Sequence, residues 1–112
     1  MAEARITKEG EILKVVLSGE LVLNNAAAIK DEIKARLEEA PKVMVDLAGL
    51  DFVDSSGLGV LISWFKAVNE RKGTIVYCAL SPYVAKIIRI AKLDKIFLLA
   101  DDEEQAKVLL LK

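Results

Sequence analysis

Side chains able to do chemistry are most concentrated in residues 51–59, which read DFVDSSGLG. This stretch carries two carboxylates, Asp51 and Asp54, and two hydroxyls, Ser55 and Ser56. It follows an apolar run typical of a strand and leads into one typical of a helix. We therefore expect it at the carboxyl end of a strand, where α/β sheets usually present their sites. A hydroxyl in a first helical turn lies near free backbone N–H groups and the positive end of the helix dipole.

The residues of this stretch leave two interpretations open. A phosphate on such a serine would be held by the free N–H groups and repelled by the neighbouring carboxylates. It would add about −1.5 to −2 charges at one exposed point, a large change for a surface that docks a partner. Alternatively, Asp-Ser-Ser is an ordinary helix N-cap, and the glycines allow close packing of helix on sheet. Physical chemistry alone favours the structural interpretation.

Several classes of catalyst are excluded by the residues that the chain lacks. It has no histidine, which rules out a Ser-His-Asp triad, a histidine base and histidine-ligated zinc or haem. Its single cysteine, Cys78, lies in an apolar run and is expected to be a buried core residue. No GxxxxGK or GxSxG pattern is present, and no base accompanies the serines. We therefore expect no catalytic residue, no metal and no cofactor.

Composition and charge indicate one globular domain spanning residues 1–112. Hydrophobic residues make up 54% of the chain and charged residues 29%, which argues against disorder. Sixteen basic and seventeen acidic residues leave a net charge of −1, so no general nucleic-acid binding is expected. The first residues lack a signal-peptide pattern, and no apolar run approaches the roughly 20 residues that span a bilayer. The expected location is the cytoplasm, without membrane insertion.

Hydrophobic periodicity predicts the order β-β-α-β-α-β-α-β-α, a single α/β domain. The expected sheet is mixed, with four to five strands and about four helices, because the first two strands read as a hairpin. Strands are predicted at 6–9, 11–18, 42–47, 74–80 and 96–99. Helices are predicted to begin after Asn24-Asn25, near Gly57, at Pro82 and with the acidic run 101–104.

The helix predicted over residues 57–71 carries more apolar residues than one buried stripe requires. Its expected buried residues are Leu58, Leu61, Ile62, Phe65 and Val68. Val60, Trp64 and Ala67 form a second row at helical spacing. Tryptophan is enriched at interaction hot spots, so our hypothesis places Ser56, Val60 and Trp64 along one docking face. The alternative is that Trp64 packs beneath a neighbouring helix or the chain ends.

Two blocks, MVDLAGLDFVDSSGLGVLISWFKAV and GTIVYCALSPYVAKIIRIAKLDKIF, resemble the STAS domain. The resemblance runs from about Glu11 to Ala106 and is strongest to the bacterial anti-sigma factor antagonists. It implies a binding switch, not an enzyme. Such proteins bind an anti-sigma factor, often a serine kinase of the GHKL ATPase type, and so release a sigma factor. The kinase phosphorylates a serine of the DSSG motif, and a serine phosphatase restores the complex.

Carried onto this chain, the resemblance makes Ser56 the phosphate acceptor and Ser55 its neighbour. Asp54 would position the hydroxyl or assist the metal site of the kinase, which would supply Mg²⁺ and ATP. One departure is Val22, which stands where phosphorylated members commonly have an aspartate. Asn24 or Asn25 could supply polar contacts there. The partner-binding residues expected are Asp54, Ser55, Ser56, Gly57, Val60, Trp64, Asn24 and Asn25.

Two other functions compete with the phosphorylated antagonist. A STAS subunit of a larger assembly, such as a lipid-transport ATPase complex or a stress-signalling scaffold, would account better for Val22 and would bind its partners without phosphorylation. A small-molecule hydrolase acting through Ser56 is the least supported, because the chain offers no nearby base.

Overall fold

Five strands and four α-helices form the protein, which the computed structural model describes over residues 1–112. The strands are β1 (Ala2–Glu9), β2 (Ile12–Leu21), β3 (Lys42–Val53), β4 (Thr74–Cys78) and β5 (Leu98–Ala100). The helices are α1 (Leu23–Lys34), α2 (Ser55–Glu70), α3 (Pro82–Ile90) and α4 (Glu103–Leu110). Two short 3-10 helices are η1 (Leu37–Glu39) and η2 (Leu93–Lys95).

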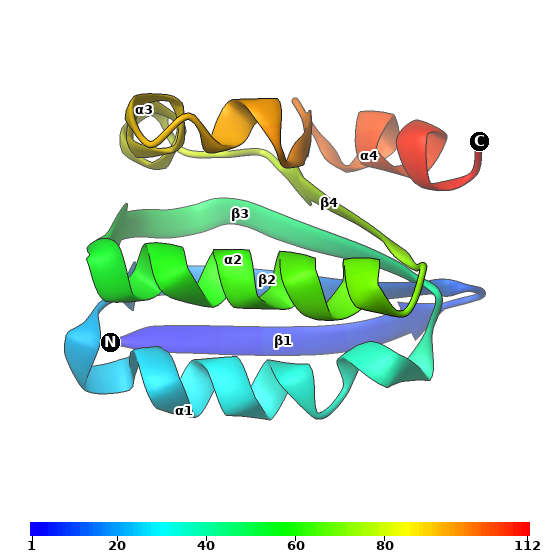
Figure 1. Cartoon of the computed structure of the whole chain (residues 1–112), viewed down its shortest axis with the longest axis horizontal. Helices are drawn as coiled ribbons and strands as arrows, with labels where there is room; N and C mark the ends of the chain where they lie inside the picture. Colours follow the sequence, from blue (N-terminus) through cyan, green and yellow to red (C-terminus); the bar gives the residue numbers. More distant parts are fainter.

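The strands make one sheet in the order β1-β2-β3-β4-β5 (Figure 1). β1 pairs with β2 antiparallel, in a hairpin that turns at Gly10 with a φ of +62°. The other neighbours pair in parallel, with helices in the connections. A mixed sheet of five strands with four α-helices confirms the fold class predicted from the sequence.

Alternation along the strands divides the apolar residues between two clusters. The larger cluster joins one row of each of β2, β3 and β4 to α1, α2 and α3. The smaller one packs α4 onto the opposite residues of the sheet; its buried members are Ile12, Met44, Val76, Cys78, Ala106 and Leu110. Cys78 is therefore a core residue as expected, and burial raises the pKa of its thiol to about 12.

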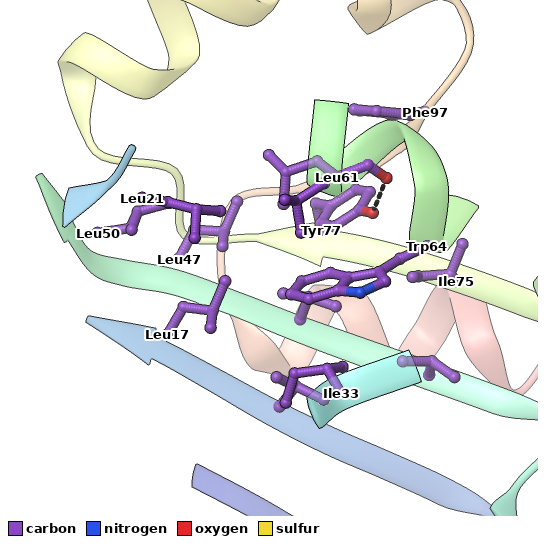
Figure 2. Packing of buried hydrophobic residues seen from close by; sticks show 14 of the residues in the cluster. Leu17, Leu21, Ile33, Leu47, Leu50, Leu61, Trp64, Ile75, Tyr77 and Phe97 are labelled. Carbon is purple, nitrogen blue, oxygen red and sulfur yellow. Dashed lines mark hydrogen bonds between the residues drawn. The ribbon is translucent and has the colours of Figure 1, made fainter. Parts of the chain in front are cut away.

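Trp64 lies inside the larger cluster, not on the surface. Its side chain is fully buried, and its indole Nε1 donates a hydrogen bond of 3.2 Å to the carbonyl oxygen of Lys30 in α1. Figure 2 shows the indole in the same region of the core as Ile33 and Ile75. Val60, one turn earlier, is only 3% exposed. The expectation that Trp64 belongs to a docking face is therefore wrong, because α1 covers this side of α2. Val60, although nearly buried, lines a groove together with Ser56.

The buried stripe of α2 is correspondingly rotated from the predicted one. Its buried residues are Gly57, Val60, Leu61, Trp64 and Val68. Leu58, Ile62 and Phe65, which the sequence placed in the core, are only half-buried at its margin.

A second polar contact ties α2 to the sheet. The hydroxyl of Tyr77 in β4 donates a 2.6 Å hydrogen bond to the carbonyl oxygen of Leu61, drawn as a dashed line in Figure 2. The ring also lies against Phe97, with 4.8 Å between the ring centroids. Burial raises the pKa of the Tyr77 hydroxyl well above its ordinary value. The helix that begins with the two serines is thus fixed from both sides.

Several boundaries differ from those predicted. β3 continues to Val53, six residues past the predicted end, and pairs with β2 across two irregularities in register. β1 begins at Ala2 because it pairs with β2 as far as Gly19. The last strand starts at Leu98, after the buried Phe97. None of the helices combines the length and the hydropathy needed to cross a bilayer.

Candidate functional site

Asp54 connects the beginnings of two helices. Its Oδ1 accepts a hydrogen bond of 2.9 Å from the backbone N–H of Gly57, which makes it the N-cap of α2. Its Oδ2 accepts one of 3.0 Å from the N–H of Leu23, the first residue of α1. These N–H groups, Gly57 first, hold the pKa of the carboxyl below its ordinary value. Both carboxylate oxygens are therefore engaged in positioning α1 and α2 side by side.

This double cap predicts a pH-dependent contribution of Asp54 to stability. A carboxyl whose pKa is lowered by folding stabilises the protein above its unfolded pKa of about 3.9, and that stability is lost as the pH falls through the folded pKa. Asp54→Asn keeps one amide oxygen as acceptor but loses the carboxylate charge and the second acceptor. We expect the variant to have a lower Tm than the parent at pH 7. Thermal denaturation should show the difference shrinking toward pH 3; an equal difference at both values would contradict this account.

Ser55 and Ser56 occupy the first turn of α2. Ser55 is exposed, whereas Ser56 is half-buried and lines a shallow groove between α1 and α2. Leu23 of α1 lines the same groove and is 76% exposed. Ser56 thus lies at the surface of the groove, which an exposed apolar side chain also lines.

Gly57 has a structural role in this first turn. A Cβ placed on Gly57 would lie 2.1 Å from the carbonyl oxygen of Leu21, the last residue of β2. Only a residue without a side chain allows α2 to approach the sheet so closely. Gly57 is also buried, so its part in any partner contact is indirect, through the position that it gives to Ser56.

Neither asparagine occupies the N-cap position of α1, but Asn25 supports the cap from position N3. The helix begins at Leu23, three residues before the predicted start, with Val22 at the N-cap position and no side-chain cap bond. Asn25 instead folds back on the loop: its Oδ1 accepts from the N–H of Val22 at 3.0 Å, and its Nδ2 donates to the carbonyl oxygen of Glu20 at 2.9 Å. Asn24 is exposed in the first turn. Asn25 therefore joins the loop to the start of α1, whereas the side chain of Asn24 is exposed to solvent.

An exposed aromatic pair at the carboxyl end of β3 was not predicted from the sequence. Phe52 is 37% exposed and stacks on Tyr83 of α3, which is 40% exposed, with 5.1 Å between ring centroids. Phe52 lies two residues before Asp54, within the stretch already singled out. The exposure of Phe52 could not be predicted, because the irregular register of β3 interrupts the alternation of buried and exposed residues along the strand.

The chemistry open to this site is binding and modification of a hydroxyl. The oxygens of Asp54 already accept hydrogen bonds from backbone N–H groups, so Asp54 is poorly placed to act as a base for Ser56. No group of three or more His, Cys, Asp or Glu side chains is arranged to hold a metal ion. What the site offers is a serine hydroxyl at a helix N-terminus, bordered by the apolar side chain of Leu23.

The family model of the STAS domain matches residues 3–106, nearly the whole chain. The chain belongs to the STAS domain family. The family resemblance deduced from the DSSG stretch is therefore confirmed.

Relatives within the family point in the same direction. An anti-sigma F factor antagonist of Paenibacillus polymyxa is 30% identical over 97 residues, covering 85% of this chain and 83% of the relative. Among solved structures, an anti-sigma factor antagonist of Mycobacterium paratuberculosis superposes with a TM-score of 0.90 at 23% identity, covering 100% of this chain and 96% of the other. The phosphorylated form of the Bacillus cell fate determinant SpoIIAA superposes with a TM-score of 0.72 at 20% identity, covering 96% and 99%. The last two likenesses establish the fold alone.

Proposed function

We propose that this STAS domain is an anti-sigma factor antagonist whose binding is switched by phosphorylation of Ser56. It would bind an anti-sigma factor in the cytoplasm and so release a sigma factor. In this proposal the chain is a binding protein without catalytic activity. The anti-sigma factor is a serine kinase of the GHKL type that brings its own Mg²⁺ and ATP, and a serine phosphatase reverses the modification.

The observation that carries the proposal is the presentation of Ser56 at the first turn of α2. Its side chain lines an open groove, beside the exposed Leu23 and next to the exposed Ser55. The similarity to an anti-sigma F factor antagonist supports the role of antagonist in this proposal.

A phosphoryl group on Ser56 would change the surface without disturbing the fold. The N-terminus of α2 favours a negative charge, so the modified helix remains stable. A partner pressed against Leu23, however, would have to remove water from a group carrying about −1.5 to −2 charges. Burying such a charge without a matching cation is strongly unfavourable, so the complex dissociates.

Phosphorylation of Ser56 can be tested by intact-mass spectrometry. The chain is incubated with Mg-ATP and lysate of its source organism, beside the variants Ser56→Ala and Ser55→Ala. We expect one added phosphoryl group in the parent and in Ser55→Ala, and none in Ser56→Ala. A lysate that modifies a known substrate but leaves this chain unmodified would contradict the proposal, as would loss of the modification in Ser55→Ala alone.

Val22 supports a second candidate, a STAS subunit that binds constitutively within a larger assembly. Val22 caps α1 without any side-chain acceptor, at the position where phosphorylated members commonly have aspartate. Its side chain therefore supplies no acidic group beside the α2 N-terminus. If Val22→Asp raises the rate of Ser56 phosphorylation on the order of tenfold, the activation free energy falls by about 1.4 kcal/mol. The valine then slows phosphorylation in the parent chain. If the parent and Val22→Asp both stay unmodified and bind their partner with equal affinity, the constitutive subunit is favoured.

A further inference from the structure

The groove at Ser56 does not end there but continues along α1 and α2. One depression of about 350 Å³ is lined by Ser56, Gly59 and Ser63, and a second of about 640 Å³ also includes Gly59 and Ser63 and reaches Arg71. Because they share two residues, the depressions form one trough, here called the α1/α2 furrow. From Ser56 to Arg71, α2 advances about 22 Å at 1.5 Å per residue. The furrow is therefore long enough for about four turns of a helix.

The floor of the furrow is open because its α2 side is made of small residues. Gly59, Ser63 and Ala67 follow one another at intervals of four and so lie on one face of the helix. A Cβ built on Gly59 meets no atom within 4 Å. A docked backbone can therefore come close to α2 at this point, and Ile62 supplies apolar contact beside it.

The charged side chains that line the middle of the furrow are all basic. Lys30 and Lys34 line it from α1, and Lys66 lines it from α2. None of the three lysines takes part in an ion pair within the chain. The acidic residues of α1, Asp31 and Glu32, do not line it.

Acidic side chains border the furrow only at the end far from Ser56. Glu38 and Glu70 line it there, beside Arg71. The guanidinium of Arg71 is already engaged, since its Nη2 donates to the carbonyl oxygens of Leu37 and Ala40. The furrow thus presents unpaired positive charge in its middle, in a chain whose net charge is −1.

We infer that the α1/α2 furrow is a docking groove for an acidic amphipathic helix of the regulator that binds at Ser56. An apolar stripe would lie on the small residues of α2, while carboxylates on its flanks pair with Lys30, Lys34 and Lys66. Helix-in-groove binding combines these features, and complementary charge sets partner choice and association rate. The inference rests on the proposed function in one respect: that function identifies the protein that carries the docking helix as the regulator.

A peptide titration of the full chain tests the furrow directly. The probe is an 18-residue helical peptide with a leucine and alanine stripe flanked by glutamates, and the matched probe has lysines in place of the glutamates. In NMR titrations, the glutamate peptide should shift the backbone amide signals of Gly59, Ser63 and Ala67. We expect the lysine peptide to bind at least tenfold more weakly.

Charge-reversal variants give the matched control on the protein side. The double variant Lys34→Glu with Lys66→Glu should bind the glutamate peptide at least tenfold more weakly than the parent does. Lys86 and Lys95 are exposed lysines elsewhere, and the double variant Lys86→Glu with Lys95→Glu should change the affinity for this peptide less than twofold. Equal binding of both peptides, or shifts away from the furrow, would overturn the inference. A concentration-dependent dimer of the parent that Lys34→Glu with Lys66→Glu abolishes would also overturn the inference, because a second copy of the chain would then occupy the furrow. None of these readouts involves phosphate, so a failure here is distinct from a failure of the Ser56 proposal.

Discussion

Gly57→Ala should destabilise the protein by about 2 kcal/mol, although alanine is the better helix former. The new Cβ would lie 2.1 Å from the carbonyl oxygen of Leu21, a backbone atom that also accepts from the N–H of Asp54. Overpacking of this kind typically costs 1–3 kcal/mol or more, while the gain in helix propensity is only about 1 kcal/mol. The steric cost should therefore exceed the gain. Urea denaturation monitored by circular dichroism measures the change in the free energy of unfolding.

Gly59→Ala is the matched control, two residues further along the same helix. Nothing lies within 4 Å of a Cβ at Gly59, so only the propensity gain remains. We expect this variant to be more stable than the parent by about 0.5–1 kcal/mol. Opposite signs for the two substitutions would show that the first glycine of the DSSGLG stretch is required by packing. A Gly57→Ala variant as stable as Gly59→Ala would contradict the packing assigned to α2.

Trp64→Ala should be comparably or more damaging, with a loss of about 3–5 kcal/mol in the free energy of unfolding. The side chain is fully buried, and its removal leaves a cavity between α1, α2 and the sheet. It also leaves the carbonyl oxygen of Lys30 without its indole donor. Since domains of this size have only about 5–15 kcal/mol of stability, the variant should keep only part of the parent's free energy of unfolding and should unfold at a much lower Tm. Differential scanning calorimetry would show this.

Leu23→Ala serves as the control for Trp64→Ala, because it truncates an exposed apolar side chain in place of a buried one. Leu23 is 76% exposed beside Ser56, so its truncation should change the free energy of unfolding by less than about 0.5 kcal/mol. A small stability loss at Trp64 would contradict the burial of its indole. Trp64→Phe, which keeps most of the apolar volume, should recover more than half of the loss if packing dominates it.

Much of the fold was accessible from local patterns. The period-2 run of Leu13, Val15 and Leu17 gave a strand because alternate residues share one face of a sheet, and the structure buries all three. Pro82 began α3 as predicted, because proline suits the first helical turn. The carboxyl half of β3 escaped prediction because exposed residues such as Ala48 and Gly49 interrupt its apolar pattern where the register shifts.

The sequence by itself determined the order of elements, the family, and the place of Ser56 in the first turn of a helix. Each depends on residues within a few positions of one another, whose spacing is set by helix and strand geometry. It could not determine which apolar row of α2 is buried, because both rows have helical spacing.

Tertiary structure decided that row through contacts between residues distant in the chain. The indole of Trp64 reaches Lys30, 34 residues earlier, and the carboxylate of Asp54 reaches Leu23, 31 residues earlier. These contacts exist only after α1 has docked beside α2 on the parallel strands. The same docking gives Gly57 its contact with Leu21 and creates the furrow, since both depend on how closely the two helices approach the sheet and each other. Local periodicity carries no information about that distance, and for this reason the burial of Trp64 and the presence of the furrow could be known only from the folded chain.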